Sequence, residues 1–308
     1  MKYSLYKEVD KIVNKSVHII GATRSGTTFF ELLISSLRET ETFDEPPMLR
    51  VLMPLIDKLK KEDFKLLFNA YLFEERLMCS IPGRNLNLNL KDQTSIYNSK
   101  SKEEILRRIQ KSYRRLEIFP MALKSTIAFK QVEVGQYLSK LIDYYPNFKT
   151  ILILRKPAGV VSSILEKKWF SKKQLFNKSG KWFFKKGKKW NVPDWLPKNK
   201  ENYFLKLSEA ERSILYYIYE YKNFKSILKK KKFKPIVVDY DDFTNNSKIL
   251  FLKISKKLNL KYGSLTKKLL KEVKVNKKKN KISKNLIRSK LYLQAVKLYN
   301  ELNLYSIK

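Results

Sequence analysis

A short glycine loop between an apolar run and a helical pattern is the feature that most constrains how this chain can fold. Residues 17–20, Val-His-Ile-Ile, form an apolar run of the kind found in buried strands. The loop Gly-Ala-Thr-Arg-Ser-Gly-Thr-Thr follows at residues 21–28, and apolar residues then recur at helical spacing from Phe29 to Leu37. The segment is therefore predicted to fold as a strand, a tight glycine loop and a helix.

Strands and helices are predicted to alternate along the rest of the chain. Residues 149–154 have a strong strand pattern, residues 233–239 form another, and residues 121–123 are a short strand candidate. Such alternation predicts an α/β fold of three layers, in which helices flank both faces of a central, mainly parallel sheet. Helical patterns cover about residues 48–60, 62–79, 102–117, 132–144, 157–165, 208–230, 247–258 and 285–302.

The domain organisation is predicted to be simple. The chain has 308 residues, of which 43% are hydrophobic, and this is enough for one large domain with insertions. Residues 167–203 contain all four tryptophans among many lysines, and we interpret them as an irregular insertion or lid. A helical C-terminal extension is expected from about residue 263, with a polar loop at residues 274–284. We therefore expect a single domain over residues 1–308 with these two additions.

Several bulk properties narrow the class of protein. No apolar run approaches the about 20 residues that a membrane helix needs, and residues 1–16 contain no apolar segment typical of a secretory signal. The single cysteine, Cys79, excludes an internal disulfide and a metal site built from several cysteines. Because the chain also has only one histidine, no metal ion is expected. These properties favour a protein of the reducing cytoplasm.

The net charge of +37 is extreme and has two explanations. Proteins that bind nucleic acid or a membrane surface have such a charge, and so do proteins whose AT-rich genome places lysine at solvated positions. Lysine supplies 54 of the 66 basic residues, whereas proteins that read phosphates and bases usually keep more arginine for its planar fork. We therefore interpret the charge as compositional and expect no nucleic-acid partner, although the charge still attracts anionic ligands.

The glycine loop has the composition of an anion-binding site. Backbone N–H groups at the start of the following helix point outward, and the helix dipole favours negative charge there. Gly26 allows an oxygen to approach the backbone closely, and Arg24 adds a charge that can bind bidentately. Ser25, Thr27 and Thr28 add hydroxyl donors. A plain glycine turn before a capped helix is the alternative, but this density of donors favours a phosphate site. The loop lacks the Lys that follows the second glycine in a nucleotide-triphosphate P-loop.

At these residues the chain resembles the PAPS-dependent sulfotransferase family, whose members transfer a sulfuryl group from PAPS (3′-phosphoadenosine-5′-phosphosulfate) to an acceptor. The loop looks like the family's 5′-phosphosulfate loop, in the Arg-Ser-Gly-Thr-Thr variant of a loop that has Lys in cytosolic members. The resemblance implies that Arg24, Ser25, Gly26, Thr27 and Thr28 bind the cofactor. It also implies that Arg24 neutralises the leaving oxygen, and that the fold is the P-loop NTPase-like sulfotransferase fold.

A second stretch resembles the motif with which the family binds the 3′-phosphate of PAPS. That motif has an Arg at a strand end and a Ser eight residues later, and here Arg155 and Ser163 match it, with a proline between them. The strand is expected to fix Arg155 at the carboxyl edge of the sheet, where ligands of such folds bind. Two weaker resemblances, at residues 123–154 and 233–260, occur in the family's order along the chain.

Sulfuryl transfer requires in-line positioning, stabilisation of charge and removal of a proton from the acceptor. Cytosolic family members use a His as the base, but His18 lies inside the first strand, where we expect it to be packed. By resemblance to members with the same loop, such as protein-tyrosine sulfotransferases, Glu45 is the predicted base. Glu31, expected on the polar side of the first helix, is the alternative. Lys124 resembles the lysine that steadies the transferring sulfonate in the family.

No residue of the sequence identifies the acceptor. The resemblance implies a hydroxyl or amine on a small molecule or carbohydrate, and residues 167–203 are either a lid with aromatic faces for sugar rings or ordinary packing. Two other functions remain open: a P-loop-type kinase or NTPase, and a non-enzymatic polyanion-binding protein. The first predicts Mg²⁺-dependent binding of a nucleoside triphosphate. The second predicts salt-dependent binding that requires neither Arg24 nor Arg155.

Overall fold

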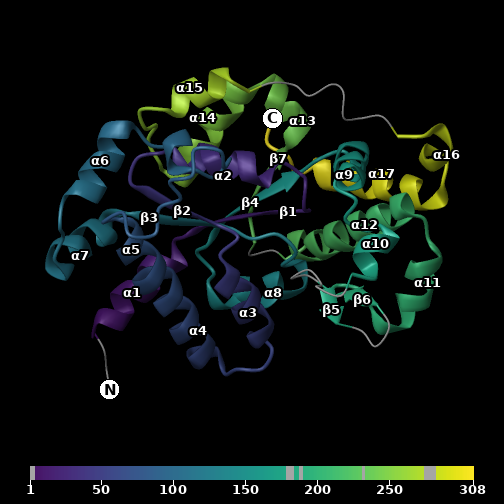
Figure 1. Ribbon diagram of the computed structural model, residues 1–308, viewed down its shortest axis with the longest axis horizontal. Helices are drawn as coiled ribbons and strands as arrows, with labels where there is room; N and C mark the ends of the chain where they lie inside the picture. The colour runs from purple at the N-terminus through teal and green to yellow at the C-terminus, as the bar shows by residue number, and fades with distance from the viewer. Residues whose placement is uncertain (1–3, 178–183, 187–189, 231–232, 274–281) are drawn as a thin grey trace.

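The computed structural model describes residues 4–177, 184–186, 190–230, 233–273 and 282–308, and its centre is a five-stranded sheet with helices on both faces (Figure 1). Every pair of neighbouring strands in this sheet is parallel. The predicted three-layer α/β fold with a parallel central sheet is therefore confirmed. The strands lie in the order β2 (Thr40–Asp44), β3 (Thr126–Lys130), β1 (Val17–Gly21), β4 (Lys149–Leu154) and β7 (Ile236–Asp239).

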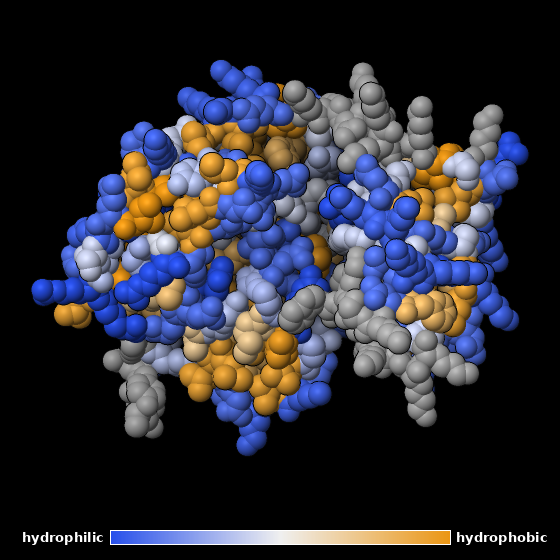
Figure 2. Space-filling model, in the orientation of Figure 1, coloured by the Kyte–Doolittle hydropathy of each residue, from blue (hydrophilic) through white to orange (hydrophobic). Residues whose placement is uncertain are grey.

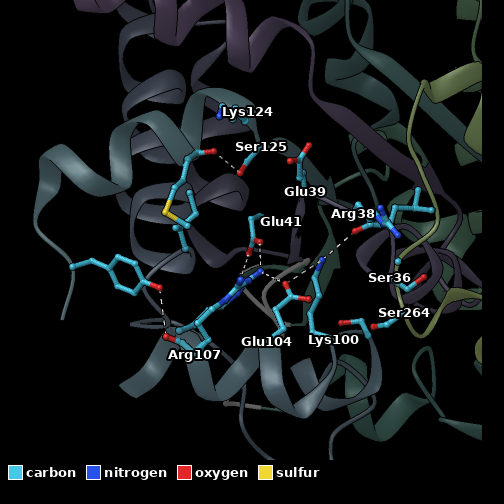
Figure 3. A pocket seen from close by; sticks show the side chains of 17 residues that line it. Ser36, Arg38, Glu39, Glu41, Lys100, Glu104, Arg107, Lys124, Ser125 and Ser264 are labelled. Atoms are coloured by element: carbon cyan, nitrogen blue, oxygen red, sulfur yellow. Dashed lines mark hydrogen bonds and ion pairs between the residues drawn. The ribbon is translucent and has the colours of Figure 1, made fainter. Parts of the chain in front are cut away.

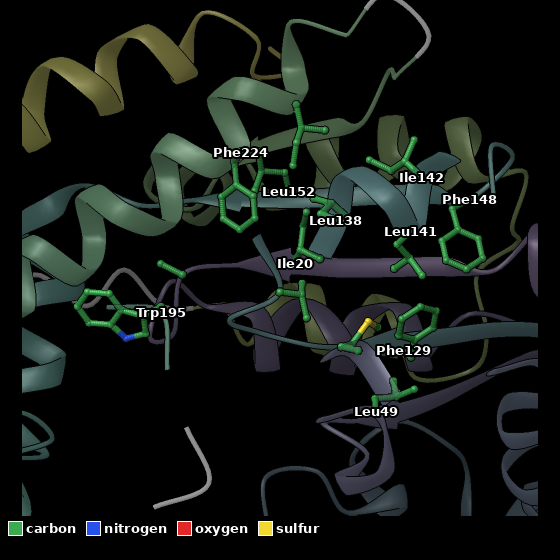
Figure 4. Close-up of a cluster of buried hydrophobic side chains, with 14 of the residues drawn as sticks. Ile20, Leu49, Phe129, Leu138, Leu141, Ile142, Phe148, Leu152, Trp195 and Phe224 are labelled. Carbon is green, nitrogen blue, oxygen red and sulfur yellow. The ribbon is translucent and has the colours of Figure 1, made fainter. Parts of the chain in front are cut away.

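The buried strands divide their side chains between two apolar clusters because successive residues of a strand point to opposite faces. In β1, Val17 and Ile19 pack in one cluster, whereas Ile20 packs in the other. In β4, Ile151 and Ile153 belong to the first cluster and Leu152 to the second, which Figure 4 shows in close-up. Helices that pack against the first cluster are α2 (Thr27–Ser35), α13 (Tyr240–Asn245), α14 (Ser247–Leu258) and α15 (Thr266–Lys271).

The second cluster is larger, and the remaining long helices contribute buried side chains to it. The longest of them is α12 (Glu209–Leu228), which contacts α8, α9 and α17. Helices with buried side chains in this cluster are α1 (Ser4–Asn14), α3 (Pro47–Leu55), α4 (Lys61–Ala70), the π-helix η1 (Tyr71–Leu77), α5 (Met78–Ser80), α7 (Arg115–Lys124), α8 (Gly135–Tyr144), α9 (Pro157–Glu166), α10 (Lys172–Leu175), α11 (Glu201–Lys206) and α17 (Lys290–Asn303). The remaining elements are α6 (Lys102–Gln110), α16 (Lys284–Ile287), the short helices η2 (Ile96–Asn98) and η3 (Lys198–Lys200), and the antiparallel strands β5 (Phe184–Lys186) and β6 (Asn191–Pro193).

The strand predicted at residues 121–123 is wrong. These residues belong to α7, which buries Ile118 and Ala122 four positions apart, the spacing of a helix face. The third strand of the sheet in chain order begins at Thr126, directly after this helix. The helix predicted at residues 102–117 is likewise divided into α6 and α7, and the C-terminal helix is divided at Ser289, whose hydroxyl caps α17.

The connections after β1 and β4 create the place where a ligand can bind. These two strands are neighbours, but α2 leaves β1 toward the first cluster, whereas α9 leaves β4 toward the second. In parallel sheets the strand ends separate at such a point and leave a crevice at the carboxyl edge. Both predicted phosphate motifs lie here, because the glycine loop follows β1 and Arg155 follows β4.

In the described part of residues 167–203, several apolar side chains pack against the core. Trp195 is buried against Phe204 and Tyr216, and Trp190 stacks on Phe204. Trp182 and most of the predicted polar loop at residues 274–284 lie outside the described residues. Within the described part of the chain, no helix is both long and apolar enough to cross a membrane. On the face seen in Figure 2, hydrophilic residues separate the exposed apolar residues into patches.

Candidate active site

One cavity of about 570 Å³ brings together most of the predicted site residues at the carboxyl edge of the sheet. Its walls come from the glycine loop, the ends of β2 and β3, the residue after β4, the middle of α9 and the residue after β7. The predicted residues that line it are Arg24, Gly26, Thr27, Thr28, Glu45, Arg155 and Ser163, and the other lining residues are Thr23, Phe29, Asp44, Gln93, Lys130, Val132, Trp169 and Tyr240.

Ser25 is the loop residue that does not fit the prediction of a hydroxyl donor facing the cavity. Its side chain is fully buried and does not line the cavity. The backbone N–H of Ser25 donates to the carbonyl of Ala22, which closes the turn and directs the side chain beneath the loop. The tightness of the turn therefore makes Ser25 a residue that supports the loop.

The conformation of the loop depends on glycine at position 26. Gly26 has φ +104° and directly precedes α2, which has no side-chain cap. A Cβ at this position would lie 2.3 Å from the ring of Tyr240. Gly26 thus permits a left-handed backbone and a ring in direct contact with it.

We expect Gly26→Ala to destabilise the protein by about 1–3 kcal/mol, because the new methyl group would strain the backbone and displace Tyr240. Thermal unfolding of the variant and the wild type measures this difference. A melting temperature equal to that of the wild type would contradict the described loop geometry.

Hydrogen bonds join the two predicted phosphate motifs directly. The Nε of Arg24 donates to the hydroxyl of Ser163 over 3.0 Å, and the Nη1 of Arg155 donates to the carbonyl of Arg24 over 3.0 Å. The guanidinium of Arg155 also lies 4.9 Å from the ring centroid of Tyr240. The Nε of Arg155 is buried and has no hydrogen-bond partner among the described residues. Two arginines thus converge on one cavity, and one of them keeps a donor unused.

Lys130, at the carboxyl end of β3, is the cation that the sequence analysis missed. Its side chain is buried, and Nζ donates to the hydroxyl of Thr28 over 2.8 Å. The same Nζ forms ion pairs with Asp44 and with Glu45, the latter at 3.1 Å. Burial would lower the pKa of Lys130, but the carboxylates of Glu45 and Asp44 outweigh it and raise the pKa. The ammonium group is therefore held charged beside the glycine loop.

Glu45 follows β2 and faces the same cavity. Its Oε1 pairs with Lys130, and its Oε2 accepts a hydrogen bond of 2.6 Å from Arg50. The backbone N–H of Glu45 donates to the carbonyl of Lys130, and its φ of +38° turns the chain away from the sheet. The end of β2 and the end of β3 are thereby fixed together, with a carboxylate and a cation side by side.

Glu31 and His18 occupy less accessible positions. Glu31 is buried rather than on the polar side of α2, and burial together with the charge of Asp44 raises its pKa well above the ordinary value. Glu31 therefore favours the protonated form. His18 is fully buried and stacks on Phe129 at 4.4 Å, and burial lowers its pKa to about 3, so that it is packed and neutral as expected.

Comparison with known proteins decides the family. The profile of the sulfotransferase family matches residues 16–195. The chain belongs to the sulfotransferase family. No curated protein matches the sequence. One similar solved structure is the sulfotransferase domain of the Synechococcus PCC 7002 olefin synthase, with a TM-score of 0.48, 12% identity and 95% of each chain covered. A second is the sulfotransferase domain from the curacin biosynthetic pathway, with a TM-score of 0.48, 12% identity, and 94% of this chain and 97% of the other covered. A third is a sulfotransferase from Alicyclobacillus acidocaldarius, with a TM-score of 0.45, 13% identity, and 95% of this chain and 96% of the other covered.

The structure of this sulfotransferase family member does not bring Lys124 to the site. Lys124 is the last residue of α7 and is exposed beside a different cavity, shown in Figure 3, that opens near the first residues of β2 and β3. A strand rises about 3.3 Å per residue, so the first and last residues of β3, four steps apart, are separated by about 13 Å. The lysine at the carboxyl end of that strand is Lys130.

Two tyrosines of α12 form hydrogen bonds to the backbone of the two motifs. They were not among the residues predicted from the sequence. The hydroxyl of Tyr216 accepts a hydrogen bond of 2.8 Å from the N–H of Thr23, and the hydroxyl of Tyr217 donates to the carbonyl of Arg155 over 2.9 Å. Each hydroxyl thus fixes the backbone of one motif to the same helix. The only signal in the sequence was the pair of adjacent tyrosines within an amphipathic pattern, which is equally typical of plain core packing.

The same helix buries Glu220, and this predicts a pH dependence of stability. Burial raises the pKa of Glu220 to about 8 from the ordinary value of 4.5, and the charge of Asp194 adds to the shift. Between these two pH values the folded protein keeps a proton that the unfolded chain releases, so stability falls as the pH rises.

Between pH 4.5 and pH 8, Glu220 is expected to lower the free energy of unfolding by about 3–5 kcal/mol. We expect Glu220→Gln to remove most of this decrease. Denaturant unfolding near pH 5 and near pH 8 measures it, with the exposed Glu75→Gln as the matched control. Parallel pH curves for the wild type and Glu220→Gln would show that Glu220 titrates normally.

Proposed function

We propose that this chain is a PAPS-dependent sulfotransferase, which moves the sulfuryl group of PAPS to a hydroxyl or amine acceptor and leaves PAP. The observation that most supports the proposal is the direct link between the two arginine motifs, through Arg24, Ser163 and Arg155. A nucleotide with phosphates at both its 3′ and 5′ positions requires two cationic positions in one cavity. We also propose that the protein acts in the cytoplasm as a single domain over residues 1–308, with additions at about 167–203 and from about 263.

The residues of the cavity fit such a donor. Arg155 has a buried Nε without a partner, and an anion supplies the acceptor that this donor needs. The loop before α2 offers the start of a nine-residue helix, where backbone N–H groups favour negative charge. We infer that Arg24, Gly26, Thr27 and Thr28 hold the 5′-phosphosulfate, with Ser25 shaping the loop. Arg155 and Ser163 then hold the 3′-phosphate.

Bound PAPS supplies an activated sulfuryl group attached to a phosphate oxygen that can leave. In the proposed mechanism, Arg24 and Lys130 neutralise the negative charge that develops around the moving group. Lys130 takes the role expected for Lys124, because it contacts Thr28 at the start of α2. Charge stabilisation of this kind is most effective where cations are fixed in advance, and the bonds of Lys130 to three side chains fix it.

Glu45 is the proposed general base. As the acceptor oxygen bonds to sulfur, the bond from sulfur to the leaving phosphate oxygen breaks, and the acceptor proton passes to Glu45. Glu31 is less suited, because its raised pKa favours the protonated form. Glu45 is paired with Arg50 and Lys130 in the absence of ligands, and such contacts commonly rearrange when a substrate binds.

Of the described tryptophans Trp169, Trp190 and Trp195, Trp169 is placed to act as part of a lid. It lines the donor cavity, and the Cζ of Arg24 lies 5.9 Å from its ring centroid. Trp195 is buried in the aromatic cluster below. We therefore assign Trp169 to the cover of the donor and look elsewhere for contacts to the acceptor.

A transfer assay tests the proposal. Purified protein is incubated with radiolabelled PAPS and separate pools of sugars, amino sugars and phenols, with PAP or ATP–Mg²⁺ as competitor. We expect labelled sulfate esters or sulfamates in one pool, and suppression of the product by PAP but not by ATP–Mg²⁺. Release of label only as free sulfate in every pool would contradict the proposal.

A further inference from the structure

A second cavity of about 230 Å³ adjoins the donor cavity. The two share Thr28, Asp44 and Gln93 as lining residues. Thr28 and Asp44 are also direct partners of Lys130, beside the proposed base. A molecule in the second cavity can therefore present an atom to the point where the donor, the base and the fixed cation meet.

The lining of this second cavity is mostly polar and includes the carboxyl groups of Glu31, Glu41 and Asp44, of which Glu41 is paired with Arg108 and Asp44 with Lys130. The loop between α5 and α6 contributes the amides of Asn85, Asn87 and Gln93 and the hydroxyl of Thr94. The side chain of Gln93 has no hydrogen-bond partner among the described residues, so its donor and acceptor are available at the shared wall. Asn85, Asn87 and Thr94 already form hydrogen bonds within the chain, so the unused polar group at this wall is that of Gln93. Amides and hydroxyls recognise hydroxyl groups of a ligand.

Arg76 adds an unused positive charge to this cavity. Its guanidinium lies over the ring of Phe43, with Cζ 4.9 Å from the centroid. Its Nε is buried without a hydrogen-bond partner, and no carboxylate of the described chain pairs with it. Arg50 and Arg108 differ from Arg76, because Arg50 is paired with Glu45 and Arg108 is paired with Glu41. An unpaired, partly buried guanidinium that lines a cavity is suited to bind an anion.

We propose that the second cavity is the acceptor site and that the acceptor is a polyhydroxylated molecule with an acidic group, of the sugar-acid type. Arg76 binds the acidic group, the amides of the α5–α6 loop bind hydroxyls, and a hydroxyl at the other end reaches Asp44 and Thr28. This inference rests on the proposed sulfotransferase activity. The volume is below the about 300–1,000 Å³ of sites for drug-sized ligands, so the cavity takes one small unit or the end of a chain.

Calorimetric titration with glucuronate and glucose tests the assignment, because the two sugars differ in the carboxylate alone. Titrations are made with PAP present, on the wild type and Arg76→Gln, with Arg84→Gln as the matched control. Arg84 is exposed on the same segment and does not line the cavity. We expect the wild type to bind glucuronate about 10- to 100-fold more tightly than glucose. This factor is the usual contribution of one charge-assisted hydrogen bond, which glucose cannot form with Arg76.

Arg76→Gln is expected to reduce glucuronate binding to the level of glucose, while Arg84→Gln keeps the preference. Unchanged PAP affinity in Arg76→Gln would show that the variant is folded and that the effect is confined to the second cavity. Wild-type protein that binds glucuronate no more tightly than glucose would overturn the inference, and so would a preference that survives in Arg76→Gln. Failure of the proposed function is a separate result, namely absence of PAP binding in the wild type.

Discussion

Replacement of Arg155 by alanine is expected to weaken PAP binding by about 2–5 kcal/mol, or about 30-fold to several-thousand-fold in Kd. Arg155 is largely buried, its Nη1 fixes the backbone of Arg24, and its Nε has no partner within the described residues. The change removes a charged donor from the proposed 3′-phosphate and also loosens the loop proposed to hold the 5′ group. Isothermal titration with PAP measures the effect.

Two variants separate charge from geometry in this experiment. Arg155→Lys keeps the charge but loses the planar fork, and we expect a loss intermediate between the wild type and Arg155→Ala. Arg115→Ala is the matched control, because Arg115 is exposed and pairs with Glu74 on the surface. Equal PAP affinities for the wild type and Arg155→Ala would exclude Arg155 from the donor site.

The second large effect is expected for Glu45→Gln, which should lower kcat by about 10²–10⁴-fold, the usual contribution of a general base. The amide keeps the shape of the side chain and its place beside Lys130 and Arg50, but it cannot accept the proton. PAP affinity should change little, because Glu45 is not among the residues proposed to hold the phosphates. Steady-state kinetics with the acceptor from the transfer assay measure kcat.

The control for this variant is Glu75→Gln, an exposed glutamate outside the cavity. An unchanged kcat in Glu45→Gln would show that Glu45 is not the general base. Asp44 would then be the next candidate for this role, because it lines both cavities. A drop in kcat together with a large loss of PAP affinity would instead indicate that Glu45 acts by holding Lys130 in place.

The glycine loop and the arginine motif could be predicted from the sequence because each is a local pattern. In each motif the end of a strand, a turn and the beginning of a helix lie within about ten residues of the sequence. Their hydrogen-bond donors are therefore close together whatever the rest of the fold. The structure adds what is not local, namely that Arg24 reaches Ser163 across 139 positions of the sequence. Burial of Ser25 could not be predicted, since it depends on which way the turn closes.

Lys124 was predicted as the site lysine by resemblance to the family, together with a strand that was placed about five residues too early. The apolar residues at 121–123 fit a short strand and a helix face equally well, and the sequence pattern alone does not separate the two. Moving the strand to Thr126–Lys130 places a different lysine at its carboxyl end. The site residue thus depended on a strand register that only the packing of α7 and β3 determines.

Arg76 and its cavity could not be found from the sequence at all. Arg76 is one of twelve arginines, and its significance arises from Phe43 below it, the loop beside it and the absence of a paired carboxylate among the described residues. These neighbours come from three separate segments of the chain. Contacts of this kind depend on tertiary structure and leave no periodic or spaced pattern.

The most direct test of the central claim is calorimetric titration of the purified protein with PAP beside ATP–Mg²⁺. The two converging arginines, the glycine loop and the buried unpaired donor predict tight binding of the 3′,5′-bisphosphate and weak or absent binding of the triphosphate. A preference for ATP–Mg²⁺, or no binding of PAP, would contradict the assignment of the cavity to a PAPS donor.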